Sequence, residues 1–198
     1  MSRIIINKEA IILASASPRR RAYLQDLGLS FSVSVADIEE QISSNESPVA
    51  YIERLAHGKA GNVAEKYPKN WIVAADTVVC FEGMVLEKPV SEEDAVIMLL
   101  QLSGQEHVVK TSICLFNKEQ SVADIRSVSS RVFFWQFSEK VARAYVQTGE
   151  SQDKAGSYGI QGKGGLLVRE IHGSYTNVVG LPLCEFIEML SHRELISQ

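Results

Sequence analysis

Apolar and polar positions along the chain alternate between strand-like and helix-like patterns. An apolar run that ends near Ser15 predicts a strand, a helical pattern follows over about residues 18–27, and residues 31–35 predict a second strand. Ser47 and Pro48 then favour the start of a longer helix, because serine caps a first turn and proline fits its first position. Strands that alternate with helices indicate an α/β protein.

The longer helix is expected to run from Pro48 to about Tyr67, and a buried strand follows it. The apolar residues of the helix share one face: Tyr51, Ile52, Leu55, Ala56, Ala60 and Val63. Residues 71–81 are then almost continuously apolar, which is typical of a central strand covered on both faces. Asp76 and Thr77 interrupt this run. Because a buried carboxylate is costly unless a cation or a metal compensates it, Asp76 is the strongest single candidate for chemistry.

Turn and cap signals divide the second half of the chain. We expect a helix opened by the capping-box pair Ser91 and Asp94 and ending at Leu102, an antiparallel hairpin of residues 108–116 and 121–137, a helix opened by Ser138 and ending near Thr148, and a last helix from about Pro182. Between the last two helices, residues 156–165 are dense in glycine and residues 166–168 look strand-like. No internal repeat or linker is visible, so one domain is expected, in which any second lobe belongs to the same sheet.

Composition narrows the classes of protein to which the chain can belong. Its 198 residues, 45% hydrophobic and 22% charged, suit one soluble globular domain. The net charge of −4 and the pI near 5.6 argue against broad binding to DNA or RNA, which needs a basic surface. The three cysteines and four histidines are widely spaced and predict neither disulfides nor a zinc site. Without a signal peptide or a run of about 18 apolar residues, we expect a cytoplasmic protein with no membrane partner.

Three consecutive arginines, residues 19–21, occupy the first turn of the first predicted helix. A helix N-terminus already carries partial positive charge, so a cation there is unfavourable unless an anion offsets it. Ser17 as the cap and Pro18 as the first helical residue leave backbone N–H groups unpaired beside Arg19 and Arg20. The segment therefore predicts either a phosphate-binding turn or an exposed basic turn that pairs with surface acids.

Two further carboxylates, Glu39 and Glu40, follow the second predicted strand in a stretch without regular structure. Together with Asp76 they suit Mg²⁺ or Mn²⁺, which prefer a few hard oxygen ligands completed by phosphate oxygens. Alone, the pair is a solvated acidic turn, and Asp76 could instead cap a backbone group or pair with a lysine. Lys59 and Lys88 are candidate cations for a phosphate, although each is by default a surface ammonium.

The glycine-dense segment carries two residues suited to a nucleotide base. The segment matches neither the phosphate-binding P-loop nor the dinucleotide-binding pattern, because residues that each pattern requires are absent. Tyr158 offers an aromatic face, and Gln161 offers an amide that both donates and accepts hydrogen bonds. The alternative is a turn packed over the core.

In sequence order, these segments resemble the motifs of one known family, the Maf nucleotide pyrophosphatases. The matching stretches are residues 15–20, Glu40, residues 54–59, residues 75–78, Lys88-Pro89, residues 102–104, residues 153–162 and residues 173–182. The resemblance covers nearly the whole chain. It implies an α/β fold of the inosine-triphosphatase type: a single domain, residues 1–198, whose elongated mixed β-sheet is flanked by helices and has a cleft between two lobes. It also implies a homodimer, since members are often dimeric.

The resemblance further implies an activity. Members hydrolyse nucleoside triphosphates to the monophosphate and pyrophosphate with a divalent metal ion, here expected to be Mg²⁺ or Mn²⁺. The combination of Arg19, Thr77 and Gln161 is similar to the subgroup that acts on dTTP and UTP, and not to the subgroup that acts on 7-methyl-GTP. One side-chain amide can satisfy both the N3–H donor and the O4 acceptor of uracil or thymine, whereas cytosine reverses that order.

A mechanism follows from the resemblance as a hypothesis. Water attacks the α-phosphorus, Glu40 and Asp76 hold the metal, and Asp76 is the catalytic base. The residues expected to bind the substrate are Ser15, Arg19, Arg20, Lys59, Thr77, Lys88 and Gln161. Two alternatives stay open: a non-catalytic nucleotide-binding regulator of cell division, and a nucleic-acid binder, which the acidic pI disfavours.

Overall fold

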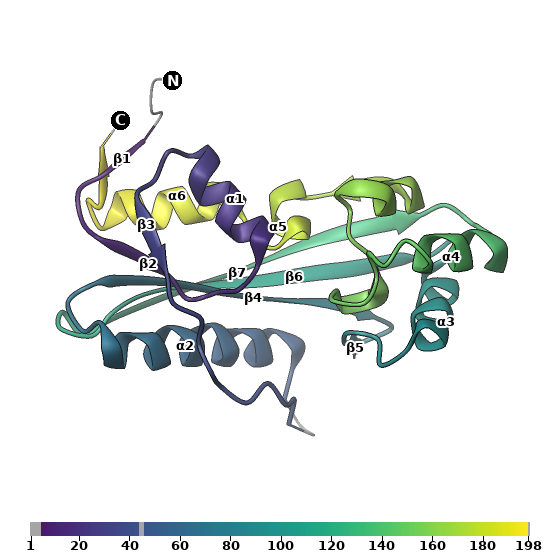
Figure 1. Cartoon of the computed structure of the whole chain (residues 1–198), viewed down its shortest axis with the longest axis horizontal. Coiled ribbons are helices and arrows are strands. Elements are labelled where there is room, and N and C mark those ends of the chain that lie inside the picture. Colours follow the sequence, from purple (N-terminus) through teal and green to yellow (C-terminus); the bar gives the residue numbers. More distant parts are fainter. Residues whose placement is uncertain (1–4, 44–45, 198) are drawn as a thin grey trace. The chain divides into compact units, whose positions relative to one another are not determined.

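The computed structural model describes residues 5–43 and 46–197, which form two compact units (Figure 1). The first unit contains the described residues of Met1–Asp76, Thr111–Val128 and Gly180–Gln198, and the second contains Thr77–Lys110 and Ser129–Val179. Three long strands contribute residues to both units: β4 (Trp71–Phe81), β6 (Glu106–Asn117) and β7 (Val122–Phe134). Each unit has its own buried apolar core.

Parallel strands form the centre of the first unit. β2 (Ile11–Leu13) pairs in parallel with β3 (Phe31–Val33) on one side and with β4 on the other. The register sets Leu13 beside Val33 of β3 and Val73 of β4. Parallel neighbours are expected where helices connect consecutive strands, as the sequence pattern predicts.

Helices cover both faces of this part of the sheet (Figure 1). α2 (Pro48–Lys66) lies on one face, and α1 (Pro18–Asp26) and α6 (Leu183–His192) lie on the other. Successive residues of a strand point to opposite faces. In β4, Val73 packs into the core under α1 and α6, whereas Ala74 packs into the core under α2. Both faces are therefore apolar, which explains the nearly continuous apolar run of this strand.

The starts of α1 and α2 follow the local signals in the sequence. The hydroxyls of Ser17 and Ser47 each accept a hydrogen bond from the backbone N–H three residues later, and a proline follows each serine. The predicted apolar stripe of α2 is buried: Tyr51, Ile52, Leu55, Ala56, Ala60 and Val63. Both predicted helices are confirmed.

Smaller elements surround the long strands in the second unit. β5 (Met84–Leu86) pairs antiparallel with β4, and β8 (Val168–His172) pairs antiparallel with β7. The helices are α3 (Glu92–Leu102), α4 (Glu139–Val146) and α5 (Tyr175–Val179), and two 3₁₀ turns, η1 (Ala155–Ser157) and η2 (Gly162–Leu167), lie in the glycine-dense segment. The core of this unit is an apolar cluster around Leu99, Phe134 and Tyr145.

In the described part of the chain, the main sheet has seven strands in the order β3-β2-β4-β6-β7-β8, with β5 added to β4. β1 (Ile6–Asn7) and β9 (Ile196–Ser197) form a separate antiparallel pair. Since parallel and antiparallel pairs occur in the same sheet, the predicted fold class, α/β with a mixed sheet flanked by helices, is confirmed. The single domain and the cleft stay predictions. Among the described residues, no helix is long and apolar enough to cross a membrane.

Beyond small shifts of element ends, the structure differs from the predicted elements in one strand and in two helix caps. Residues 166–167 continue the turn η2, and the strand predicted there begins only at Val168. Asp94 accepts a 2.9 Å hydrogen bond from the N–H of Val90, one residue before the cap of α3, so the capping box is not reciprocal. Ser138 precedes α4 as predicted, but its hydroxyl makes no cap bond.

Candidate functional site

Lys59 contacts two carboxylates at once. Its Nζ atom lies 2.5 Å from Oδ1 of Asp76 and 2.7 Å from Oε1 of Glu40. The side chains of Lys59 and Asp76 are each only 12% exposed, whereas that of Glu40 is 45% exposed. The buried carboxylate of Asp76 and the half-buried ammonium of Lys59 compensate each other, so the contact offsets part of the cost of burying either charge. The structure thus brings together three residues that the sequence predicts for one site.

Strand and helix geometry explain why these side chains meet. Asp76 follows Ala74 by two residues, so it points to the face of β4 that α2 covers. On α2, Lys59 lies three residues after Ala56 and four before Val63, along the same buried stripe. Lys59 therefore occupies a position that the helical period would assign to an apolar residue, and its ammonium meets Asp76 there.

Side chains of α2 also hold the loop that carries Glu40. The hydroxyl of Tyr51 donates a 3.0 Å hydrogen bond to the carbonyl of Glu40, and Nη2 of Arg54 donates a 2.9 Å bond to the carbonyl of Gln41. Arg54 also hydrogen-bonds the carboxylate of Glu46 at 2.7 Å, which lowers the pKa of Glu46. The sequence pattern predicts Tyr51 only as an apolar core residue, and it does not predict the hydrogen bond that the Tyr51 hydroxyl donates to this loop.

The N-terminus of α1 lies beside Ser15 and Arg20. The hydroxyl of Ser15 accepts hydrogen bonds from the N–H of Ser17 at 3.2 Å and from Nη1 of Arg20 at 3.1 Å. Nε of Arg20 donates a 2.8 Å bond to the carbonyl of Gly180, which is 160 residues away in the chain. The Arg20 guanidinium is therefore held against its own unit by two acceptors.

The charge of Arg20 interacts with Asp76 and Glu40, the two carboxylates that Lys59 contacts. Burial lowers the pKa of the Arg20 guanidinium, and the positive charge of Arg19 lowers it further. The carboxylate of Asp76, and to a smaller extent that of Glu40, raises this pKa. Arg20 is thus near enough to interact with both carboxylates that Lys59 contacts. Of the two interpretations of the arginine turn, an exposed basic turn does not describe Arg20, whereas Arg21 is exposed.

Three of the predicted substrate-binding residues belong to the second unit. Thr77 follows Asp76 on β4 and is half-buried, whereas Lys88 and Gln161 are exposed. Gln161 occupies the N-cap position of η2 but makes no side-chain cap bond. The roles of these three residues stay predictions.

Tyr158, a sequence candidate for contact with a base, lies in the core of the second unit. It is only 5% exposed, its hydroxyl lies 2.7 Å from Nε2 of His107, and its ring packs edge-on against His107 and Phe134. Burial raises the pKa of Tyr158 and lowers the pKa of His107 to about 4. The packed-turn interpretation is therefore correct for Tyr158, and the suggestion that it meets a base is wrong.

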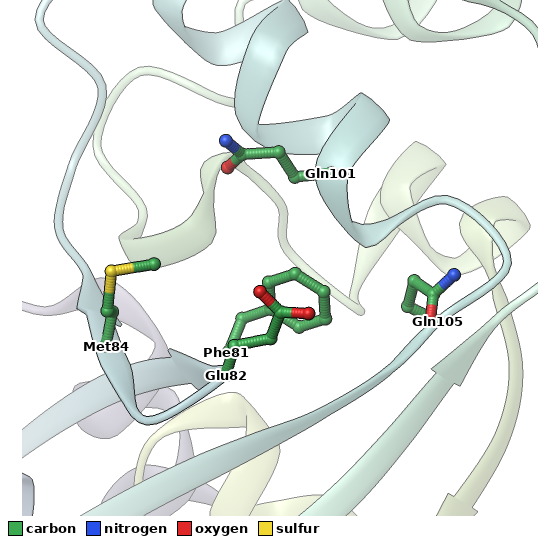
Figure 2. Close-up of a pocket in the computed structure, with 5 residues that line it drawn as sticks. All are labelled: Phe81, Glu82, Met84, Gln101 and Gln105. Atoms are coloured by element: carbon green, nitrogen blue, oxygen red, sulfur yellow. The ribbon is translucent and has the colours of Figure 1, made fainter.

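A separate cavity of about 340 Å³ lies in the second unit near the β4–β5 turn (Figure 2). It is lined by Phe81, Glu82, Met84, Gln101 and Gln105. None of the predicted site residues is among them. The lining offers no cation for a phosphate, and we assign the cavity no role in the chemistry.

The carboxylates of Asp76 and Glu40 form a donor set of hard oxygen atoms. Both contact the same nitrogen atom, so they converge on one cation, which here is the ammonium of Lys59. Over residues 5–43 and 46–197, no group of three or more His, Cys, Asp or Glu side chains could hold a metal ion. This set fits Mg²⁺ or Mn²⁺ in one way: two protein carboxylates, with oxygen atoms of a ligand and water completing the coordination.

Residues 10–193 match a family model described as Maf-like protein. The dTTP/UTP pyrophosphatase of Desulfotalea psychrophila is 49% identical over 187 residues, which cover 94% of this chain and 96% of that protein. Proteins of the same name from Nitratidesulfovibrio vulgaris and a Geobacillus species are 46% and 43% identical, over 94% and 87% of this chain and 89% and 92% of their own length. The family match spans every predicted site residue, from Ser15 to Gln161.

Among solved structures, the Ham1 protein of Staphylococcus aureus is similar with a TM-score of 0.46 and 15% sequence identity, over 64% of this chain and 72% of that chain.

Proposed function

Because the chain belongs to the Maf family, we propose that it is a nucleoside triphosphate pyrophosphatase that hydrolyses dTTP and UTP to the monophosphate and pyrophosphate. The names of its relatives support this activity. The observation that carries the proposal is the contact of Lys59 with both Asp76 and Glu40, in the electrostatic surroundings of Arg20. Cations and carboxylates held this close suit a polyphosphate that arrives together with a metal ion.

The cations of the first unit bind the triphosphate in this proposal. Arg20 and Lys59 neutralise its charge and the charge that develops on the departing pyrophosphate, which is the main source of rate in phosphoryl transfer. The hydroxyl of Ser15, already in contact with Arg20, and the N–H groups at the start of α1 donate to phosphate oxygens. Arg19 and Lys88 are proposed as further cations for the substrate.

Asp76 is the proposed general base. Its carboxylate takes a proton from the attacking water as the water oxygen bonds to the α-phosphorus. The bond from that phosphorus to the oxygen bridging to the β-phosphorus breaks, and pyrophosphate leaves with that oxygen. Lys59, at 2.5 Å from Oδ1, fixes the direction of the carboxylate. No covalent intermediate is required.

A divalent cation, Mg²⁺ or Mn²⁺, is the proposed cofactor. Asp76 and Glu40 would hold it, since carboxylate oxygens are ligands that both ions prefer. When bound, the ion supplies positive charge beside the phosphate oxygens. Because the ammonium of Lys59 already contacts both carboxylates, we expect metal binding to be weak until phosphate oxygens complete the coordination.

Gln161 and Thr77 are the proposed contacts to the base. The carbonyl of the Gln161 amide accepts from N3–H of uracil or thymine, and the NH₂ group donates to O4. The exposure of Gln161 supports this role, since an exposed amide is accessible to a ligand. The homodimer and the cytoplasmic location stay predictions.

Release of pyrophosphate from a panel of nucleotides tests the proposed function. The purified protein is incubated with UTP, dTTP, CTP or 7-methyl-GTP, each with Mg²⁺, Mn²⁺ or a chelator. We expect metal-dependent release from UTP and dTTP and none with the chelator. Nucleotide binding without release in any arm would overturn the proposal and favour a non-catalytic regulator.

A further inference from the structure

The carboxylate of Glu150 binds the backbone directly after Gln161. It accepts hydrogen bonds from the N–H of Lys163, at 3.3 and 3.1 Å, and from the N–H of Gly164, at 3.4 Å. Both N–H groups belong to the first turn of η2, which begins at Gly162. A helical turn often takes such a cap from the residue before it, but Gln161 makes no side-chain cap bond. Glu150, which lies 13 residues before Lys163 in the chain, therefore caps this turn in place of Gln161.

The backbone on both sides of Gln161 is confined. A Cβ placed on Gly164 would lie 2.1 Å from the carbonyl oxygen of Gly159, so these two glycines touch and close the segment between them. A Cβ placed on Gly162 would lie 3.1 Å from either carboxylate oxygen of Glu150. The carboxylate thus packs against the residue that follows Gln161. These contacts hold the backbone around Gln161, and they therefore set the direction in which its Cα–Cβ bond leaves the loop.

We propose that Glu150 is a positioning residue that holds the backbone from which the Gln161 amide meets the base, and that it thereby supports the selectivity for uracil and thymine over cytosine. The inference rests on the proposed function, in which that amide reads the base. The amide distinguishes uracil and thymine only while its two polar groups are held against the N3–H and O4 groups of the base. A fixed backbone restricts the first torsions of the Gln161 side chain, and so the place at which the amide meets the base, whereas the terminal amide torsion is set by the groups that the amide contacts. Glu150 therefore affects the choice of base without touching it.

Glu150→Gln isolates the contribution of the carboxylate. Glutamine keeps the size of the side chain, but it offers one acceptor oxygen to two N–H groups and turns its own NH₂ group toward backbone donors. We expect the amides of Lys163 and Gly164 to exchange hydrogen for deuterium at least about tenfold faster than in the wild-type protein. Glu150→Asp keeps the charge with a shorter reach, and its exchange rates should lie between the two.

Kinetics with UTP and CTP connect this cap to the base. For Glu150→Gln we expect the KM for UTP to rise about tenfold, with kcat within about threefold of wild type. The preference for UTP over CTP in kcat/KM should fall by about tenfold. The matched control is Glu139→Gln, which removes an exposed carboxylate of α4 that pairs with Arg143. The control should keep wild-type exchange rates, KM and nucleotide preference.

Each result decides the inference. A Glu150→Gln variant with wild-type KM and nucleotide preference would overturn it, and so would a variant whose kcat falls equally for UTP and CTP, since that pattern indicates a merely structural role. If Glu150→Gln does not fold, Glu150→Asp supplies the same comparisons. Failure of the proposed function has a different signature, a wild-type protein that releases no pyrophosphate from any nucleotide, and it would remove the inference together with its premise.

Discussion

Lys59 and Asp76 are 17 residues apart in the chain and in direct contact, with the ammonium nitrogen 2.5 Å from Oδ1 of the carboxylate. Glu40 reaches the same nitrogen from a loop, so one cation is shared by two anions. Removing the cation and removing the buried anion should have different consequences. Asp76 is expected to affect turnover above all, and Lys59 is expected to affect the free energy of unfolding as well.

Asp76→Asn should lower kcat for UTP by at least about 100-fold, because an amide does not take a proton from water near neutral pH. Asparagine has the size of aspartate and can still accept a hydrogen bond from Lys59, so calorimetry should still detect nucleotide binding. Glu65→Gln, which alters an exposed carboxylate paired with Lys118, is the control and should keep the wild-type rate. A near-wild-type rate in Asp76→Asn would refute the assignment of the base.

Lys59→Met should lower the free energy of unfolding by about 3 kcal/mol, since Asp76 would remain buried without its cation. Methionine keeps a similar length without the charge. In the matched control Lys118→Met, the broken pair is exposed, at 46% for Lys118 and 67% for Glu65, and the loss should stay below about 1 kcal/mol. Urea denaturation of the three proteins measures both values, and equal losses would contradict the prediction.

Acid should destabilise the protein through His107. Burial holds its pKa at about 4, below the ordinary value of 6.5, so the native imidazole stays neutral where the unfolded chain already binds a proton. Stability is therefore complete above pH 6.5 and is lost as the pH falls toward 4, by about 3 kcal/mol in total. His107→Gln, whose amide can still bond to the hydroxyl of Tyr158, should lack this contribution.

Urea denaturation at about pH 7 and about pH 4.5 checks this prediction by the difference between variant and wild type. His192→Gln changes an exposed imidazole and should show the wild-type pH dependence. The same slope of stability against pH in His107→Gln and in the wild-type protein would show that other groups cause the acid sensitivity.

Two glycines should respond in opposite ways to alanine. Gly164→Ala must displace the backbone, because its methyl group would lie 2.1 Å from the carbonyl oxygen of Gly159, and we expect a loss of at least about 2 kcal/mol. Gly61 lies within α2, and apart from its chain neighbours and the nearby backbone of the helix itself, no atom lies within 4 Å of the place that an alanine methyl group would take there. Gly61→Ala should therefore stabilise the protein by up to about 1 kcal/mol through helix propensity. Thermal denaturation of both variants gives the comparison, and a stable Gly164→Ala variant would contradict it.

The sequence predicts the long elements well because local signals and burial agree in them. α2 has a serine cap, a proline at its first position and an unbroken apolar stripe, and β4 has an apolar run that two covered faces require. β5 and β9 contain only three and two residues, and their pairing depends on partners elsewhere in the chain. Whether such short segments form strands depends on the strands with which they pair, so no local sequence pattern predicts them.

The candidate site is predictable where charge conflicts with burial. Asp76 conflicts with the apolar run of β4, and Lys59 conflicts in the same way with the stripe of α2, although from the sequence Lys59 is named only as a candidate cation and by default a surface ammonium. The contact of Arg20 with the carbonyl of Gly180 leaves no such signal, because every residue has a carbonyl. Tyr158 misled sequence reasoning because an aromatic ring with a hydroxyl suits a binding surface and a core equally well.

The alternation of β4 makes the site depend on the length of the strand as well as on its residues. Val73 is held beside Leu13 of β2, so the number of residues between Val73 and Asp76 decides which face receives the carboxylate. Inserting or deleting one residue there would send Asp76 toward the face under α1 and α6, away from Lys59. Evolution can exchange side chains in this segment one at a time, but a change of its length by one would separate the ion pair in a single step.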